Sequence, residues 1–197
     1  MKILDLGCGT GWTSIFFAKN GYEVIGVDIA EDSISYANKQ KEIEKLDNLT
    51  FSVYDYEDLP FNEEFDVVIF FDSLHHSVDE FLAIKMAYRS LKKGGICITS
   101  EPGKGHSKQQ NSIDAMNNFN VTEKDMPAGK IVKMAKRSGF KRYKVLPHQF
   151  FLSKWIFNSV IYTDEAIFFK PRFLRKIAKY LKIMFKPKKN SIVLLVK

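Results

Sequence analysis

The stretch Leu4-Asp5-Leu6-Gly7-Cys8-Gly9-Thr10-Gly11 decides the fold. It follows a short apolar segment, residues 2–6, which we predict as a strand, and it precedes residues 12–20, which we predict as a helix ended by Asn20 and Gly21. Glycines in such a turn permit positive φ angles and let the backbone approach a ligand closely. The following helix presents free N–H groups. Glycine turns of this kind also occur for packing alone. The residues around the turn must therefore show whether it binds a ligand.

Strand and helix signals alternate outward from this turn. The order predicts an α/β fold with a mostly parallel sheet and helices on both faces. Further strands are predicted at 23–28, 49–54, 65–71 and 96–100, and helices at 33–44 and 78–91. The second half is less regular: we expect a polar loop over 101–125, helices at 127–138 and 171–185, and strands at 143–146 and 191–196.

Acidic residues stand where the predicted strands begin and end. Asp28 ends the second strand, 21 residues after Gly7, which is the spacing at which an adenosine ribose meets a carboxylate in doubly wound folds. Asp55 follows the third strand, and Asp66 and Asp72 open and close the fourth. The alternative to ligand binding for Asp28 is that it is an ordinary carboxylate at the end of a strand. The alternative for Asp55 is that it only forms a turn.

Together, residues 4–11, Val27-Asp28, Asp55 and Phe65-Asp66-Val67-Val68 resemble the class I S-adenosylmethionine-dependent methyltransferases. Leu74-His75-His76, after the fourth strand, is similar to an element of their small-molecule, methyltransferase type 11-like group. The matching motifs cover about residues 3–103. The resemblance implies a Rossmann-like seven-stranded sheet with the last strand, 191–196, antiparallel, and it implies a methyl-transferring enzyme.

The resemblance also implies a role for each matching residue. The glycine turn would cradle the methionine part of S-adenosylmethionine, with Asp5 ordering it, and Asp28 would accept hydrogen bonds from both ribose hydroxyls. Asp55 would bind the adenine amino group, and Tyr56 and Ile29 would bracket the ring. The implied cofactor-binding set is Asp5, Gly7, Cys8, Gly9, Gly11, Trp12, Asp28, Ile29, Asp55, Tyr56, Phe71 and Asp72.

Candidates for acid–base chemistry are fewer. A base helps methyl transfer when the acceptor must lose a proton, as a hydroxyl does, and His75 or His76 could serve. The alternative is that one histidine caps the next helix and the other packs. Glu101, the third catalytic candidate, and His106 follow the fifth strand and should line the same edge; an ordinary polar loop is the alternative. We expect no metal site and no cysteine nucleophile, since Cys8 and Cys97 read as packed residues.

The net charge of +7 hides a division between the two halves of the chain. Residues 1–100 hold 9 Lys/Arg and 17 Asp/Glu, which gives this half a net charge of −8. Residues 101–197 hold 21 Lys/Arg and 6 Asp/Glu, which gives the second half a net charge of +15. Residues 170–189 contain nine of these bases and no acid. Their amphipathic pattern fits a helix packed on the domain, a helix on an anionic membrane surface, or, less well, a nucleic-acid contact.

The sequence therefore predicts one methyltransferase domain over 1–197. It would have a cofactor-binding half at 1–103 and a basic, aromatic-rich insertion at 152–189, and the lid helix that relatives carry before the turn would be missing. The acceptor would be small or lipid-linked, carbohydrate included, and methylated on oxygen. The alternatives are an RNA methyltransferase and a cofactor-binding module without catalysis. With no signal peptide and no apolar run above five residues, we expect a cytoplasmic protein that could lie at the membrane surface.

Overall fold

The computed structural model describes residues 1–119, 121–147 and 191–197. These residues form a seven-stranded sheet in the order β3-β2-β1-β4-β5-β7-β6. All neighbouring pairs from β3 to β5 are parallel, whereas β7 is antiparallel to both β5 and β6, as predicted. The strands are β1 (Lys2–Leu6), β2 (Glu23–Asp28), β3 (Leu49–Val53), β4 (Phe65–Phe71), β5 (Leu91–Glu101), β6 (Arg142–Pro147) and β7 (Ser191–Val196).

The helices of the first half begin close to their predicted positions, and the differences have local causes. The second helix starts two residues early, at Glu31, because Glu31 and Asp32 in its first turn favour the positive end of the helix dipole. The third starts at Glu80 because Asp79 caps it, accepting from the backbone N–H groups of Phe81 and Leu82. These helices are α1 (Trp12–Lys19), α2 (Glu31–Glu44), the short 3₁₀ helix η1 (Leu74–His76) and α3 (Glu80–Ser90).

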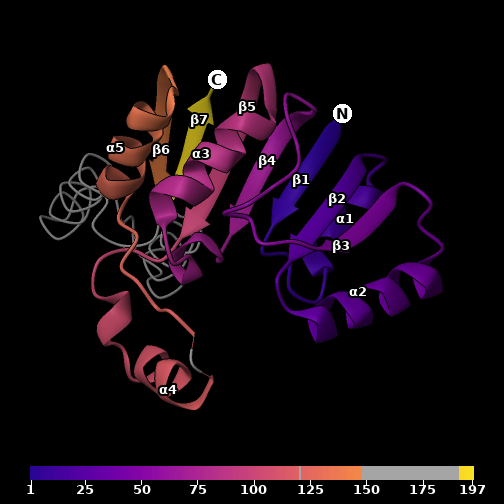
Figure 1. The fold of residues 1–197 in the computed structure, drawn as a ribbon, viewed down its shortest axis with the longest axis horizontal. Helices are drawn as coiled ribbons and strands as arrows, with labels where there is room; N and C mark the ends of the chain where they lie inside the picture. Colours follow the sequence, from indigo (N-terminus) through magenta and orange to yellow (C-terminus); the bar gives the residue numbers. More distant parts are fainter. Residues whose placement is uncertain (120, 148–190) are drawn as a thin grey trace, which may run out of the picture.

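The loop predicted over 101–125 was wrong, because this segment contains the 3₁₀ helix η2 (His106–Lys108) and the helix α4 (Gln110–Phe119). Asn and Ser in α4 are poor helix formers, which hid the helical spacing of Ile113, Met116 and Phe119. Figure 1 shows α4 beyond the sheet, on the side where the parallel strands end. The helix α5 (Ala128–Ser138) ends at Gly139, whose φ of 112° suits only glycine.

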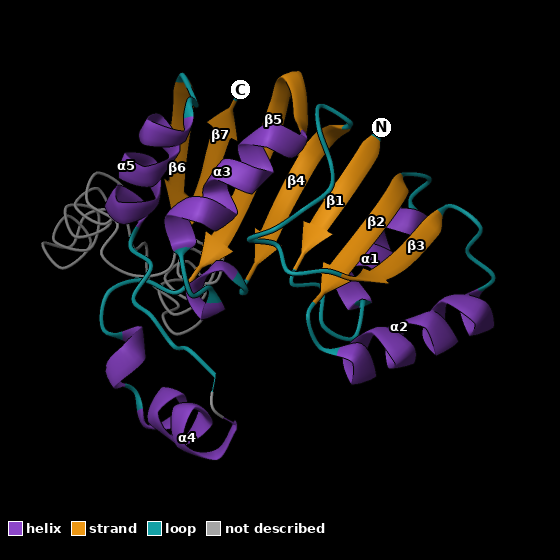
Figure 2. Ribbon diagram, in the orientation of Figure 1, coloured by secondary structure: helices purple, strands orange, loops and turns teal. Residues whose placement is uncertain are grey.

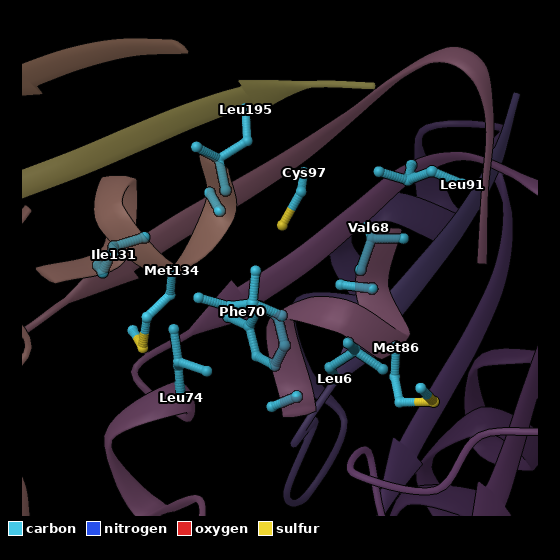
Figure 3. Packing of buried hydrophobic residues seen from close by; sticks show 14 of the residues in the cluster. Leu6, Val68, Phe70, Leu74, Met86, Leu91, Cys97, Ile131, Met134 and Leu195 are labelled. Atoms are coloured by element: carbon cyan, nitrogen blue, oxygen red, sulfur yellow. The ribbon is translucent and has the colours of Figure 1, made fainter. Parts of the chain in front are cut away.

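Apolar side chains cover both faces of the sheet. α3 and α5 lie over one face and α1 and α2 over the other (Figure 2). The buried side chains form a first cluster under α3 and α5 and a second cluster under α1 and α2. Side chains of β4 alternate between the two faces: Val68 and Phe70 belong to the first cluster, and Ile69 belongs to the second. Figure 3 shows the first cluster, with Phe70 at its centre. Burial on both sides explains why the β4 sequence is almost wholly apolar.

Among the described residues, no helix is long and apolar enough to cross a membrane. The predicted insertion at 152–189, with its basic helix at 171–185, lies outside the described residues. The division of the chain into a cofactor-binding half and an insertion therefore stays a prediction, as do all three readings of the basic segment.

A partly buried ion pair joins α3 to α5 and gives a pH-dependent prediction. Glu80 lies 2.6 Å from Lys130 Nζ and 3.3 Å from Lys124 Nζ. Burial acts to raise the pKa of Glu80, but the hydrogen bond from Lys130 and the lysine charges outweigh burial and lower it. A lowered pKa in the folded state stabilises the fold above the unfolded pKa of Glu, about 4.3, and that stabilisation is lost as pH falls through the folded value.

We therefore expect Glu80→Gln to lower the free energy of unfolding by about 0.5–1 kcal/mol at pH 7. Urea denaturation of both proteins at pH 7 and near pH 3 measures this. The difference should shrink toward zero at the lower pH, and a constant difference would show that the glutamate acts through packing instead.

Candidate active site

The glycine turn after β1 lies at the edge where the parallel strands end. Gly7, Gly9 and Gly11 all have positive φ, at 70°, 53° and 84°. The backbone N–H groups of Gly7 and Cys8 both donate to the carbonyl of Val27, at 2.8 and 3.0 Å, so the turn is tied to the neighbouring strand β2. Gly11 is the N-cap of α1. The turn is thus held against β2 and places the N-terminus of α1 at the sheet edge.

Asp5 lies beneath the turn and supports it. Its side chain is buried, and one carboxylate oxygen accepts from the hydroxyls of Thr13 and Ser14, each at 2.6 Å. Burial raises the pKa of Asp5, against the lowering effect of these two hydrogen bonds. In the structure, Asp5 therefore fixes the first turn of α1. Cys8 is also buried, and burial raises the pKa of its thiol, which does not suit a nucleophile.

Asp28 is placed at the end of β2 with both carboxylate oxygens in use. Oδ2 accepts from Gly9 N–H at 2.8 Å, and Oδ1 accepts from Ala30 N–H at 2.9 Å. Each oxygen of a carboxylate can accept a second hydrogen bond. The next residue, Ile29, is exposed. Asp28 thus joins the glycine turn to the loop after β2 and keeps acceptor capacity for a ligand's hydroxyl groups.

Asp55 and Tyr56, which follow β3 and were predicted to contact adenine, are hydrogen-bonded to other protein groups in the structure. Asp55 Oδ1 accepts from Glu57 N–H at 2.8 Å, which is the turn role left open by the sequence. The Tyr56 hydroxyl donates to the carbonyl of Ser73 at 3.1 Å, and its ring packs edge-on against Phe70. Burial is the main cause that raises the pKa of Tyr56. Contacts of Asp55 and Tyr56 with an adenine ring stay predictions.

Exposed apolar side chains gather around this edge. Trp12, at the start of α1, meets Phe71, at the end of β4, in a T-shaped contact with ring centroids 5.3 Å apart. Their exposed fractions are 61% and 42%, and Ile29 and Tyr54 at the ends of β2 and β3 are exposed as well. Asp72 follows with a positive φ of 54°. An apolar rim beside carboxylates fits a ligand with an aromatic base, a ribose and a positive charge.

A second cluster lies farther along the same edge, after β4 and β5. Glu101 is buried, and its Oε1 accepts from the backbone N–H groups of Ser73 and Leu74 at 3.2 and 2.9 Å. Its Oε2 lies 2.8 Å from His75 Nδ1. Burial acts to lower the pKa of His75, but the hydrogen bond to Glu101 and three neighbouring carboxylates raise it overall. Glu101 therefore holds the residues after β4 and orients the His75 ring.

His76, unlike His75, is exposed. Its Nδ1 donates to the carbonyl of Thr122 at 2.7 Å, and the Thr122 hydroxyl donates back to the carbonyl of His76. In a neutral imidazole with its proton on Nδ1, Nε2 keeps a lone pair. This is the arrangement that a general base needs.

Sequence reasoning missed Glu123, which lies between the histidines. Its Oε2 is 2.7 Å from His106 Nε2 and 3.7 Å from His75 Nε2. The segment that carries Glu123 returns to the edge because Asp125 accepts from the backbone N–H groups of Gly105 and Ser107. No motif or periodicity marks Glu123 in the sequence, because its position depends on this long-range contact.

Comparison with known proteins assigns the family. The family described as "Methyltransferase domain" matches residues 1–150. The chain belongs to the class I S-adenosylmethionine-dependent methyltransferases. The cofactor of this methyltransferase family is S-adenosylmethionine.

Two curated relatives each match about half of the methyltransferase. The 27-O-demethylrifamycin SV methyltransferase of Amycolatopsis mediterranei is 36% identical over 97 residues, covering 48% of this chain and 36% of the relative. The ubiquinone biosynthesis O-methyltransferase of Psychrobacter cryohalolentis is 31% identical over 102 residues, covering 50% and 40%. The aligned part is therefore less than half the length of these relatives.

A solved structure shares the fold of the methyltransferase. Phosphoethanolamine N-methyltransferase 2 of Haemonchus contortus, in complex with S-adenosyl-L-methionine, matches 100% of this chain and 48% of its own, with a TM-score of 0.71 and 22% identity. At this identity the likeness shows the fold of the methyltransferase and leaves its acceptor open.

Proposed function

We propose that the chain transfers the methyl group of S-adenosylmethionine to an oxygen atom of a small or lipid-linked acceptor, carbohydrates included. The observation that carries the proposal is the position of Asp28, whose carboxylate bonds the glycine turn and keeps acceptor capacity beside the apolar rim. The names of the two O-methyltransferase relatives support oxygen as the methylated atom.

Different residues at the strand ends bind different parts of the cofactor. Asp28 accepts from the ribose hydroxyls, and the turn from Gly7 to Gly11 lies against the methionine part. Trp12, Ile29 and Phe71 provide apolar surface that excludes water from the bound cofactor. The chemistry that S-adenosylmethionine supplies when bound is an electrophilic methyl group on a positively charged sulfur. The protein's main contribution is to hold the acceptor oxygen in line with that methyl group.

The histidines after β4 have different roles in this proposal. His76 is the base, because its Nδ1–H is held by Thr122 and its Nε2 is left to accept the proton of the acceptor hydroxyl. His75 and Glu101 are positioning residues, because both are buried and bonded to each other. The rate gain from a positioned base requires that the acceptor loses a proton, which agrees with a hydroxyl acceptor.

Two measurements on the full chain test the proposal. Isothermal titration calorimetry with S-adenosylhomocysteine should show one site per chain with micromolar or tighter affinity. Radiolabelled S-adenosylmethionine, supplied with phenols, free sugars and lipid-linked sugars in separate reactions, should then label one acceptor class. No binding would refute cofactor use by this chain. Binding followed by labelling of RNA alone would replace the proposed acceptor.

A further inference from the structure

Three side chains from separate segments converge at the edge of the sheet. His75 lies in η1 after β4, His106 begins η2 after β5, and Glu123 lies between α4 and α5. The ligand atoms of these three residues all lie within 4.8 Å of one another. We propose that His75, His106 and Glu123 bind a divalent transition-metal ion of the zinc class.

The distances between the ligand atoms suit coordination. Glu123 Oε2 is 2.7 Å from His106 Nε2 and 3.7 Å from His75 Nε2. Tetrahedral zinc with ligands at about 2.0–2.1 Å separates neighbouring ligand atoms by about 3.3 Å, which lies between these two values. The longer distance is outside hydrogen-bond range, so Glu123 does not bond His75 in the way that it bonds His106. Small shifts of the three side chains would place their ligand atoms around one ion.

Glu101 prepares His75 for this role. Metal-binding histidines usually donate their second ring N–H to a carboxylate or carbonyl, which fixes the tautomer and the ring orientation. Glu101 Oε2 is 2.8 Å from His75 Nδ1, and two backbone N–H groups hold the other carboxylate oxygen. This fixes the His75 ring with Nε2 on the side of Glu123. An isolated ion pair between His106 and Glu123 would need neither His75 nor this support.

The set of ligands selects the class of metal. Imidazole suits Zn²⁺, Cu²⁺, Fe²⁺ and Ni²⁺, whereas Mg²⁺ and Ca²⁺ prefer oxygen ligands. Two imidazoles and one carboxylate therefore favour the zinc class. Three protein ligands leave a fourth position for water or a substrate oxygen, as catalytic zinc sites do. From the sequence we expected no metal site, and no short spacing motif joins these three residues.

The site can be tested by metal binding without any acceptor. The full chain, stripped with a chelator, is titrated with Zn²⁺ by calorimetry and with Co²⁺ by visible absorption. We expect one ion per chain, tetrahedral Co²⁺ bands, and a Zn²⁺-induced rise in Tm. Mg²⁺ at the same concentrations should do none of this. If the wild-type chain does not bind Zn²⁺ with a Kd below about 100 µM, the proposal is overturned.

Variants separate this site from adventitious binding. His106→Ala and Glu123→Gln should each weaken Zn²⁺ binding at least tenfold and abolish the rise in Tm. The control is Asp66→Asn, which removes an exposed carboxylate bonded to Lys92 and should leave Zn²⁺ affinity unchanged. Circular dichroism checks that each ligand variant is folded. Because two ligand variants are used, one still tests the site if the other misfolds. Zn²⁺ binding that persists at full affinity in a folded ligand variant would overturn the site.

Discussion

Replacing Asp28 by alanine is expected to weaken S-adenosylhomocysteine binding at least a hundredfold. Two hydrogen bonds from the ribose hydroxyls to a carboxylate are worth about 1.5–3 kcal/mol each, and both would be lost. The substitution also removes the acceptors of Gly9 N–H and Ala30 N–H, which tie the glycine turn to the loop after β2. Calorimetric titration of the purified variant measures the change.

The matched control replaces Asp66, a carboxylate at the opposite end of the parallel strands. Asp66 opens β4, and its side chain accepts from Lys2 N–H and from Lys92 Nζ. Asp66→Ala should leave the affinity within about twofold of wild type, since an exposed ion pair contributes little. If Asp28→Ala binds the ligand as tightly as this control, Asp28 does not bind the ribose.

Replacing Gly11 by alanine is expected to lower the free energy of unfolding by about 2–5 kcal/mol. Part of the loss is backbone strain, because the φ of Gly11 is 84°. The rest is steric, because a Cβ at Gly11 would lie 2.9 Å from Phe51 Cε1, closer still to Cζ, and 3.0 Å from Ala37 Cβ. Phe51 is packed in the core between the sheet and α1 and α2, so its ring cannot move freely.

Gly9 provides the comparison, because it shares the positive φ and lacks the steric contact. Its φ is 53°, and a Cβ there would meet nothing within 4 Å. Gly9→Ala should therefore cost only the backbone strain, about 1–2 kcal/mol. Urea denaturation of the two variants beside wild type separates the effects. Equal losses for the two substitutions would show that Phe51 yields to the added methyl group at little cost.

The parallel part of the fold could be predicted from sequence because its signals are local. The bounds of β4 matched the prediction, since a strand buried on both faces is apolar along its whole length. The strand β5 extends further than predicted, to Leu91, because Leu91 pairs with Phe65 before the register shifts. The Lys-Lys-Gly-Gly stretch after Leu91 is typical of a turn, so the sequence predicted that the strand begins after it. A local pattern cannot show that the strand pairs with β4 on both sides of a register shift.

The candidate site was only partly predictable, for a related reason. The glycine turn and Asp28 belong to a motif with fixed spacing, and the structure brings them together as expected. The roles of Glu101 and Glu123 depend on contacts between segments distant in the chain, such as Asp125 with Gly105. Sequence patterns report neighbours along the chain, so they indicated His75 and His106 separately and gave no sign that Glu123 lies between them.

The position of β7 has a consequence for the order of events during synthesis. β7 lies between β5 and β6 in the sheet but follows both in the chain, and Ser191 pairs with Glu101 and with Pro147. The five parallel strands can assemble once residue 101 has emerged from the ribosome. β6 has no strand partner among the described residues until β7 has been made. We therefore expect nascent chains that end before residue 191 to be cleaved by proteases within β6, whereas the five parallel strands resist cleavage.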